Sequence, residues 1–99
     1  MKNIVLSADG ERKVYSVPEA VADCLYEYCL DFEKWIQSSP NAKKYRTRRG
    51  YGFDEDDFIE YLNTWIFPEQ KSVLVENLGW IDFESELPKP YTGCPQFNF

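Results

Sequence analysis

The clearest hydrophobic pattern in the chain lies between residues 17 and 37. Apolar side chains recur there at spacings of three and four, which is the period of a helix with one buried face. The stretch "SVPE" at its start predicts a capping box, in which Ser16 and Glu19 exchange hydrogen bonds with each other's backbone. We therefore expect one continuous helix over residues 17–37. Its buried face comprises Val17, Val21, Cys24, Leu25, Tyr28, Phe32, Trp35 and Ile36.

The same period predicts a second helix over residues 55–66. Asp54 is a suitable N-cap for it, and the acids that follow suit the positive end of the helix dipole. Pro68 ends this helix, because proline cannot continue the backbone hydrogen bonding. We expect both helices to share one core, formed by Leu25, Phe32, Trp35, Phe58, Leu62 and Trp65.

Shorter apolar runs predict the strands. Residues 2–15 are expected to form a β-hairpin, because Asp9 and Gly10 are a strong two-residue turn between two apolar runs. Residues 72–75 and 80–83 are expected to pair around a turn at 77–79. Residues 45–51, in which tyrosine and threonine alternate with basic residues, are expected to form an exposed strand or an extended loop.

These elements follow one another in the order ββα(β)αββ, where the bracketed strand is the segment 45–51. The order predicts an α+β fold: an antiparallel sheet with two helices packed on one face. Ninety-nine residues make one domain, residues 1–99. Residues 85–99 contain three prolines and no helical period, so we expect an extended C-terminal tail. Its aromatic residues Tyr91, Phe97 and Phe99 should pack it against the body of the domain.

Charge is strongly segregated along the chain. The net charge is −6, yet residues 43–49 carry five cations and no acid, so the other residues together carry −11. Cations neutralise phosphates and tyrosines stack on bases, which makes residues 43–51 an alternative nucleic-acid site. The four acids at 54–57 would repel a polyanion, so the favoured interpretation is an exposed basic edge or a contact with another protein. The alternative site comprises Lys43, Lys44, Tyr45, Arg46, Arg48, Arg49 and Tyr51.

The acidic faces of the two helices form the favoured partner-binding surface. On the first helix, acids recur every four residues, which places them about 6 Å apart along the axis. Tyr26 and Leu30 share that outward sector, where they either pack under another element or form an apolar anchor within an acidic rim. A merely solvated acidic face is the alternative. The predicted partner-binding residues are Glu19, Asp23, Tyr26, Glu27, Leu30, Asp56, Asp57 and Glu60.

The residue types present exclude most catalytic chemistry. The chain has no histidine, which removes Ser-His-Asp and Cys-His catalysis and the His-containing zinc sites. The three cysteines lack metal-motif spacing, and no stretch resembles a glycine-rich phosphate loop. Asp54, Asp56 and Glu60 offer oxygen ligands, but they lead directly into an apolar helix, whereas a calcium loop needs a central glycine. We expect no enzymatic activity, no cofactor and no metal.

Cysteine usage and hydropathy bear on the compartment. Cys24 and Cys29 would diverge by about 140° around a helix, too far for a disulfide, so free thiols are expected. No run of eighteen apolar residues could cross a membrane. Residues 1–7 lack the apolar core of a signal peptide. We expect a cytoplasmic protein.

Three stretches, "ERKVYSVPEAVADCLYEYCLDFEKW", "DFIEYLN" and "CPQFNF", resemble short proteins of Gram-positive bacterial mobile elements. They cover less than half of the chain and contain no signature of known mechanism, so no functional residue is carried over. The resemblance implies a counter-defence role, such as that of a small acidic inhibitor of restriction or CRISPR effectors.

Three functions follow from these observations. The favoured one is a non-enzymatic interaction protein that presents carboxylates to a basic, nucleic-acid-binding protein partner. The second is a nucleic-acid-binding regulator that uses residues 43–51. The third is a small structural subunit or homodimer that uses Tyr26, Leu30 and the C-terminal aromatic residues.

Overall fold

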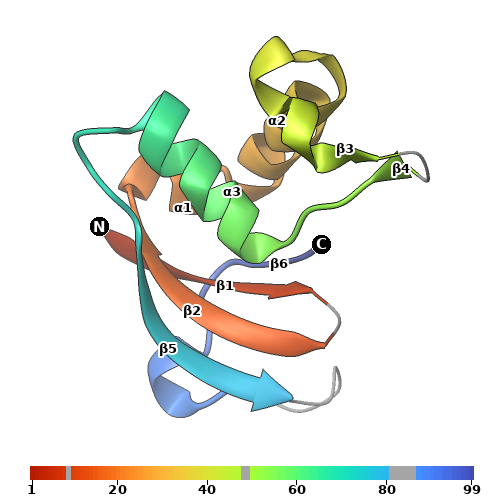
Figure 1. Ribbon diagram of the computed structural model, residues 1–99. Coiled ribbons are helices and arrows are strands. Elements are labelled where there is room, and N and C mark those ends of the chain that lie inside the picture. Colours follow the sequence, from red (N-terminus) through yellow and green to blue (C-terminus); the bar gives the residue numbers. More distant parts are fainter. Residues whose placement is uncertain (9, 48–49, 81–86) are drawn as a thin grey trace.

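A four-stranded sheet with helices on one face organises the chain (Figure 1), and the predicted α+β class is confirmed. This computed structural model describes residues 1–8, 10–47, 50–80 and 87–99. The strand order is β5-β2-β1-β6, in which β1–β2 and β2–β5 are antiparallel and β1–β6 is parallel. The strands are β1 (Lys2–Ala8), β2 (Glu11–Val17), β5 (Val73–Trp80) and β6 (Gln96–Asn98).

The sheet is therefore mixed, which corrects the expectation of a wholly antiparallel one. The predicted N-terminal hairpin is present, with Ala8 opposite Glu11 and Gly10 at a φ of +91° in the connection. Residues 87–95 lie on the face opposite the helices, as Figure 1 shows, and the chain then joins β1 as β6 in the parallel direction. This crossing of the sheet is what makes the last strand parallel.

The first predicted helix is broken in two, which corrects its expected bounds. Strand β2 extends through Val17, where Ser16 pairs with Asn3 on one side and Val73 on the other. Because sheet pairing occupies the Ser16 backbone, the predicted capping box does not form, and Pro18 is the N-cap instead. A turn at Cys24 then separates the two parts, α1 (Glu19–Asp23) and α2 (Leu25–Ser38). Cys24 is exposed rather than buried, and the three cysteines are free thiols.

The second predicted helix matches the structure closely. It consists of α3 (Glu55–Tyr61) and a π-helical turn η2 (Leu62–Ile66), and Asp54 caps it as expected. The Asp54 amide donates to Asp57 Oδ2 at 3.0 Å, and the Asp57 amide donates to Asp54 Oδ1 at 3.2 Å, which completes a capping box.

Strand β5 runs through the predicted turn at 77–79, so the expected pair of short strands is wrong where the structure describes it; residues 81–83 lie outside the described residues. The turn chemistry is used in a bulge instead. The pairing with β2 passes directly from Asn77 to Gly79, Gly79 has a φ of +71°, and its amide donates to Asn77 Oδ1 at 2.8 Å. A second bulge skips Val75.

The core lies on both faces of the sheet. On the helix face, Phe32 contacts the rings of Phe53, Phe58 and Phe99, so both helices and the C-terminus share one cluster. On the other face, Val5 and Val14 pack against Tyr91 of the short helix η3 (Lys89–Tyr91). Of the six predicted core residues, Leu25, Phe32, Phe58 and Leu62 are buried and Trp35 is half-buried. Trp65 was placed wrongly, because the π-helical turn leaves it 49% exposed.

Candidate interaction surface

The structure separates the two sets of acids that were expected to act together. The break at Cys24 puts Glu19 and Asp23 on α1 and Glu27 on α2, so no continuous stripe runs along one axis. Asp23 Oδ1 accepts a hydrogen bond from Lys2 Nζ at 2.8 Å. Lys2 is paired with Val17, the last residue of β2, so this contact lies at that end of the strand. Glu55 and Asp56, at the start of α3, pair with Lys13, which lies four residues before Val17 along β2, or roughly 13 Å away.

The acids of α3 are each engaged within the chain. Asp56 accepts hydrogen bonds from Tyr15 and Lys13, and Asp57 belongs to the capping box. Glu60 accepts from Lys44 at 3.1 Å and from the Tyr45 hydroxyl at 3.3 Å. The hydrogen bond from Tyr15 is the main cause that lowers the pKa of Asp56, so this carboxylate stays ionised. These contacts leave α3 a less open acidic face than its sequence indicates.

Tyr26 lies beside the C-terminal strand, because its ring is 6.2 Å from that of Phe97 in β6. Leu30 is half-buried, and Phe99 packs into the shared core. Tyr26 still exposes 65% of its surface, so it both contacts the tail and borders solvent.

Much of the basic segment is also engaged within the chain. Lys43, Lys44 and Tyr45 belong to the 3-10 helix η1 (Pro40–Tyr45). Tyr45 is helical and buried, which corrects the exposed, extended conformation expected at that position. Arg46 donates to the carbonyls of Ile36 and Ser39 at the end of α2. A two-stranded ladder follows, β3 (Arg46–Thr47) with β4 (Gly50–Tyr51). The predicted Arg48 and Arg49 lie outside the described residues.

Strand β5 forms the most apolar exposed surface of the described chain. It is an edge of the sheet, and within the described residues only β2 pairs with it (Figure 1). The Asn63 side chain fixes its start, because it both donates to the Ser72 carbonyl and accepts from the Ser72 amide. Large exposed apolar side chains follow along the strand: Val73, Leu74, Val75 and Trp80.

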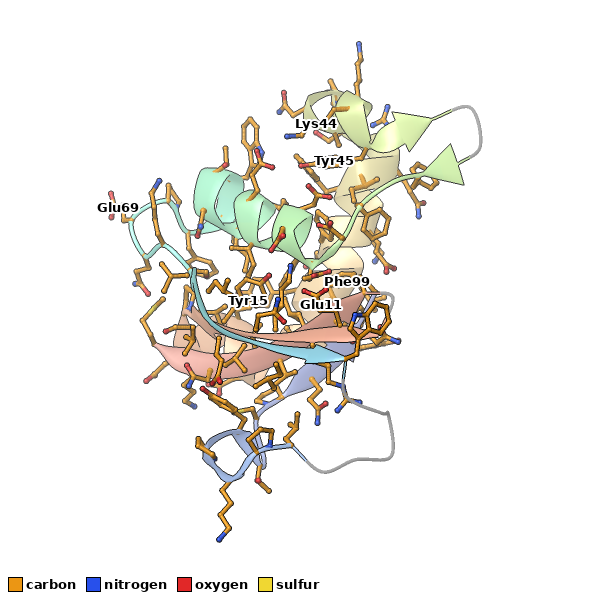
Figure 2. The ribbon with its side chains drawn as sticks, turned by 60° about the horizontal axis from the view of Figure 1, so that its bottom comes forward. Glu11, Tyr15, Lys44, Tyr45, Glu69 and Phe99 are labelled. Carbon is orange, nitrogen blue, oxygen red and sulfur yellow. The ribbon has the colours of Figure 1, made fainter. Side chains whose placement is uncertain are left out.

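A polar cluster joins β2 to the start of α3. Lys13 Nζ lies 3.0 Å from Glu55 Oε1 and 3.2 Å from Asp56 Oδ2. The hydrogen bond to Glu55 is the largest cause that raises the Lys13 pKa. Tyr15 donates to Asp56, and burial above all raises the pKa of its phenol. Figure 2 shows Glu11 and Tyr15 on the sheet side of α3, and Lys44 and Tyr45 on its other side.

A hollow opens beside this cluster, with a volume of about 290 Å³. Lys13 and Glu55 form one wall of it, and the indole of Trp80 forms another. Glu11 is held there by a hydrogen bond from Asn77 Nδ2 at 2.6 Å. Among the described residues, the lining is Ala8, Glu11, Lys13, Asp54, Glu55 and Trp80.

Most residues of this hollow and of the β5 surface were missed by the sequence reasoning. The sequence predicts only a short apolar strand at 72–75, and it indicates Glu55 as one of several acids at a helix start. One signal was available: Glu11, Lys13 and Tyr15 alternate along β2 and therefore share a face. That alternation places a charged pair on the face that the helices cover.

No described helix has both the length and the apolarity needed to cross a membrane. Nowhere in the described ranges do three metal-ligating side chains converge. Comparison of the chain with protein-family models, with curated proteins and with solved structures found no match. The resemblance to mobile-element proteins, and the counter-defence role that it implies, therefore stay predictions.

Proposed function

We propose that this protein is a non-enzymatic interaction protein whose strand β5, an edge of the sheet within the described residues, pairs with an extended segment of a basic protein partner. The observation that carries the proposal is the exposure of Val73, Leu74 and Val75 on an edge strand. Sheet edges commonly bind partners by strand addition, in which the backbone supplies affinity and alternate side chains supply specificity. Natural edge strands that avoid such contacts usually carry lysine or proline, and β5 carries neither.

The charge of the chain supports a basic partner. Its net charge is −6, and acids lie at the end of β5 in the lining of the hollow. Opposite charges on two surfaces speed their encounter and select among partners. The two bulges in β5 make its edge irregular, which counts against repeated pairing of identical edges. A specific partner fits this edge better than a second copy does.

The two other functions have less support. The nucleic-acid interpretation needs free cations and an accessible Tyr45, whereas Lys44 and Arg46 contact other groups of the chain and Tyr45 is buried. The homodimer interpretation relied on Tyr26 and the C-terminal aromatic residues, which contact each other and the core.

The test uses the full chain as an affinity bait in lysates, with one matched pair of variants. Leu74→Lys places a charge on the exposed edge, and Gln37→Lys adds the same charge at an exposed position of α2. We expect the parent and Gln37→Lys to capture the same basic protein, with binding that weakens as salt rises, and Leu74→Lys to lose it. Capture of an acidic protein, or equal capture by both variants, would contradict the proposal. If sedimentation experiments showed a dimer that Leu74→Lys abolishes, the edge would bind a second copy of this chain and not a different protein.

A further inference from the structure

The hollow between β5 and α3 contains a buried carboxylate oxygen without a partner. The Glu55 side chain is 6% exposed, and its Oε1 pairs with Lys13. Its Oε2 is buried and has no hydrogen-bond partner among the described residues. Buried carboxylate oxygens are normally satisfied, because leaving one unpaired forfeits its hydration without replacement. Glu55 is one of the residues that line the hollow, so a ligand there is a candidate partner for this oxygen.

The charged side chains that the structure describes around the hollow do not balance. Within that part of the chain, Glu11, Asp54 and Glu55 line it with one cation, Lys13, and Lys13 also pairs with Asp56. A positively charged group is therefore the kind of ligand that completes the site. A metal ion does not fit the arrangement, because no three metal-ligating side chains of the described residues converge. A larger organic cation can reach carboxylates that stand apart.

Trp80 supplies an aromatic wall that is held in place. Trp80 is 76% exposed, yet its ring lies against Gly10 in the β1–β2 turn. A Cβ on Gly10 would stand 2.7 Å from Cζ3 of the indole, so only glycine lets the ring approach this closely. Tryptophan is the side chain that attracts cations most strongly over its face. An exposed tryptophan that borders three carboxylates matches the needs of a cation site.

We propose that this hollow binds the guanidinium of an arginine side chain, which a basic partner inserts beside the end of β5. Guanidinium is planar, stacks on indole and donates to carboxylates in a fork, which suits both walls of the site. The volume of about 290 Å³ is at the lower end of ligand pockets, so it holds a side chain rather than a cofactor. This inference rests on the proposed function, because it names the chemistry of the same partner.

The test uses acetyl-arginine methylamide as the probe and acetyl-citrulline methylamide as its neutral counterpart. Binding is followed through the indole N–H signals of the ¹⁵N-labelled chain, assigned with Trp80→Phe. Trp65 provides an internal control, because it is exposed but belongs to η2. We expect the arginine probe to shift the Trp80 signal saturably, with a dissociation constant on the order of 1 mM. The Trp65 signal should not move, and the citrulline probe should have no effect.

Matched variants then locate the site. Glu55→Gln and Glu11→Gln should each weaken the probe roughly tenfold, as expected for one charge-assisted contact. Glu69→Gln should have no effect, since Glu69 lies in the loop after η2, away from Glu11 (Figure 2). The spectrum itself reports whether each variant is folded, and Glu11→Gln keeps the test valid if Glu55→Gln unfolds. Equal binding of both probes, or equal affinity in all three variants, would overturn the inference.

Failure of this inference is distinguishable from failure of the proposed function. Leu74→Lys alters the edge but none of the residues that line the hollow, so it should retain the arginine probe while it loses partner capture. If the parent captures the partner but does not bind the arginine probe, the cation site alone is contradicted.

Discussion

Strands β1 and β5 carry nearly the same apolar triplet in opposite environments. Ile4 and Leu6 of β1 are 0% exposed, whereas Val73 and Leu74 of β5 are 55% and 53% exposed. Both strands pair with β2, but the main contacts of the helices with the sheet are made to β1 and β6. The difference shows that a strand becomes core or surface through what covers it. In this protein, the strand with the exposed triplet is the one that we propose binds a partner.

The largest expected difference in stability is between two variants that each truncate one leucine of a triplet. Leu6→Ala should lower the free energy of unfolding by roughly 2–5 kcal/mol, because it leaves a cavity in a packed core. Leu74→Ala should lower it by less than about 1 kcal/mol, because its side chain is half in solvent. Denaturant unfolding of both variants measures the difference. Equal losses would mean that β5 is covered in solution and that the comparison with β1 is mistaken.

A medium effect is expected where the end of β5 meets the hairpin turn. Gly10→Ala should destabilise by about 2 kcal/mol, since it combines the left-handed φ with a clash against the Trp80 ring. Gly79→Ala is the matched control: it also has a positive φ, but open space around its Cβ, so about 1 kcal/mol is expected. In a Trp80→Ala background, the excess cost of Gly10→Ala should vanish. If the excess persists there, the indole does not rest on this turn.

The smallest effect concerns Tyr15, which lies on β2 opposite both Ile4 and Leu74. Tyr15→Phe removes the hydrogen bond to Asp56 and should lower stability at neutral pH by about 1 kcal/mol, a low value because that carboxylate is largely exposed. Carboxyl NMR titration should find a higher Asp56 pKa in the variant. An unchanged Asp56 pKa would mean that Lys13 alone holds the carboxylate.

The pH dependence of that effect has a definite sign. The pKa of Asp56 in the folded chain lies below its ordinary value. Its stabilisation is therefore present above the unfolded pKa of about 3.9 and is lost as pH falls through the folded pKa. The stability gap between parent and Tyr15→Phe should thus be full at pH 7 and shrink below about pH 4. A gap that stays constant into acid would point to lost packing rather than to the carboxylate.

Local sequence signals predicted local structure well and failed where distant segments compete. Asp54 caps α3 as expected, because the cap needs only residues three positions away. Ser16 does not cap α1, because Asn3 and Val73 pair with it in the sheet. The turn chemistry of Asn77 and Gly79 became a bulge, because pairing with β2 continues past it. No proline or glycine marks the break at Cys24, and the apolar period continues across it, so the sequence contains no signal that predicts the break.

The candidate site shows the same contrast between local signals, which the sequence reveals, and contacts between distant segments, which it does not. The α+β class, the N-terminal hairpin, the second helix and the strong segregation of charge follow from neighbouring residues or from composition, so the amino-acid pattern predicts them. Three features of the site emerge only from packing: Trp80 and Glu55 line one hollow, Lys44 and Arg46 contact other groups of the chain, and 73–75 face solvent. The pattern does not predict them, because burial and ion pairing depend on which surfaces meet. Helices that pack over β1 and β6 leave β5 uncovered, although its residues are as apolar as those of β1.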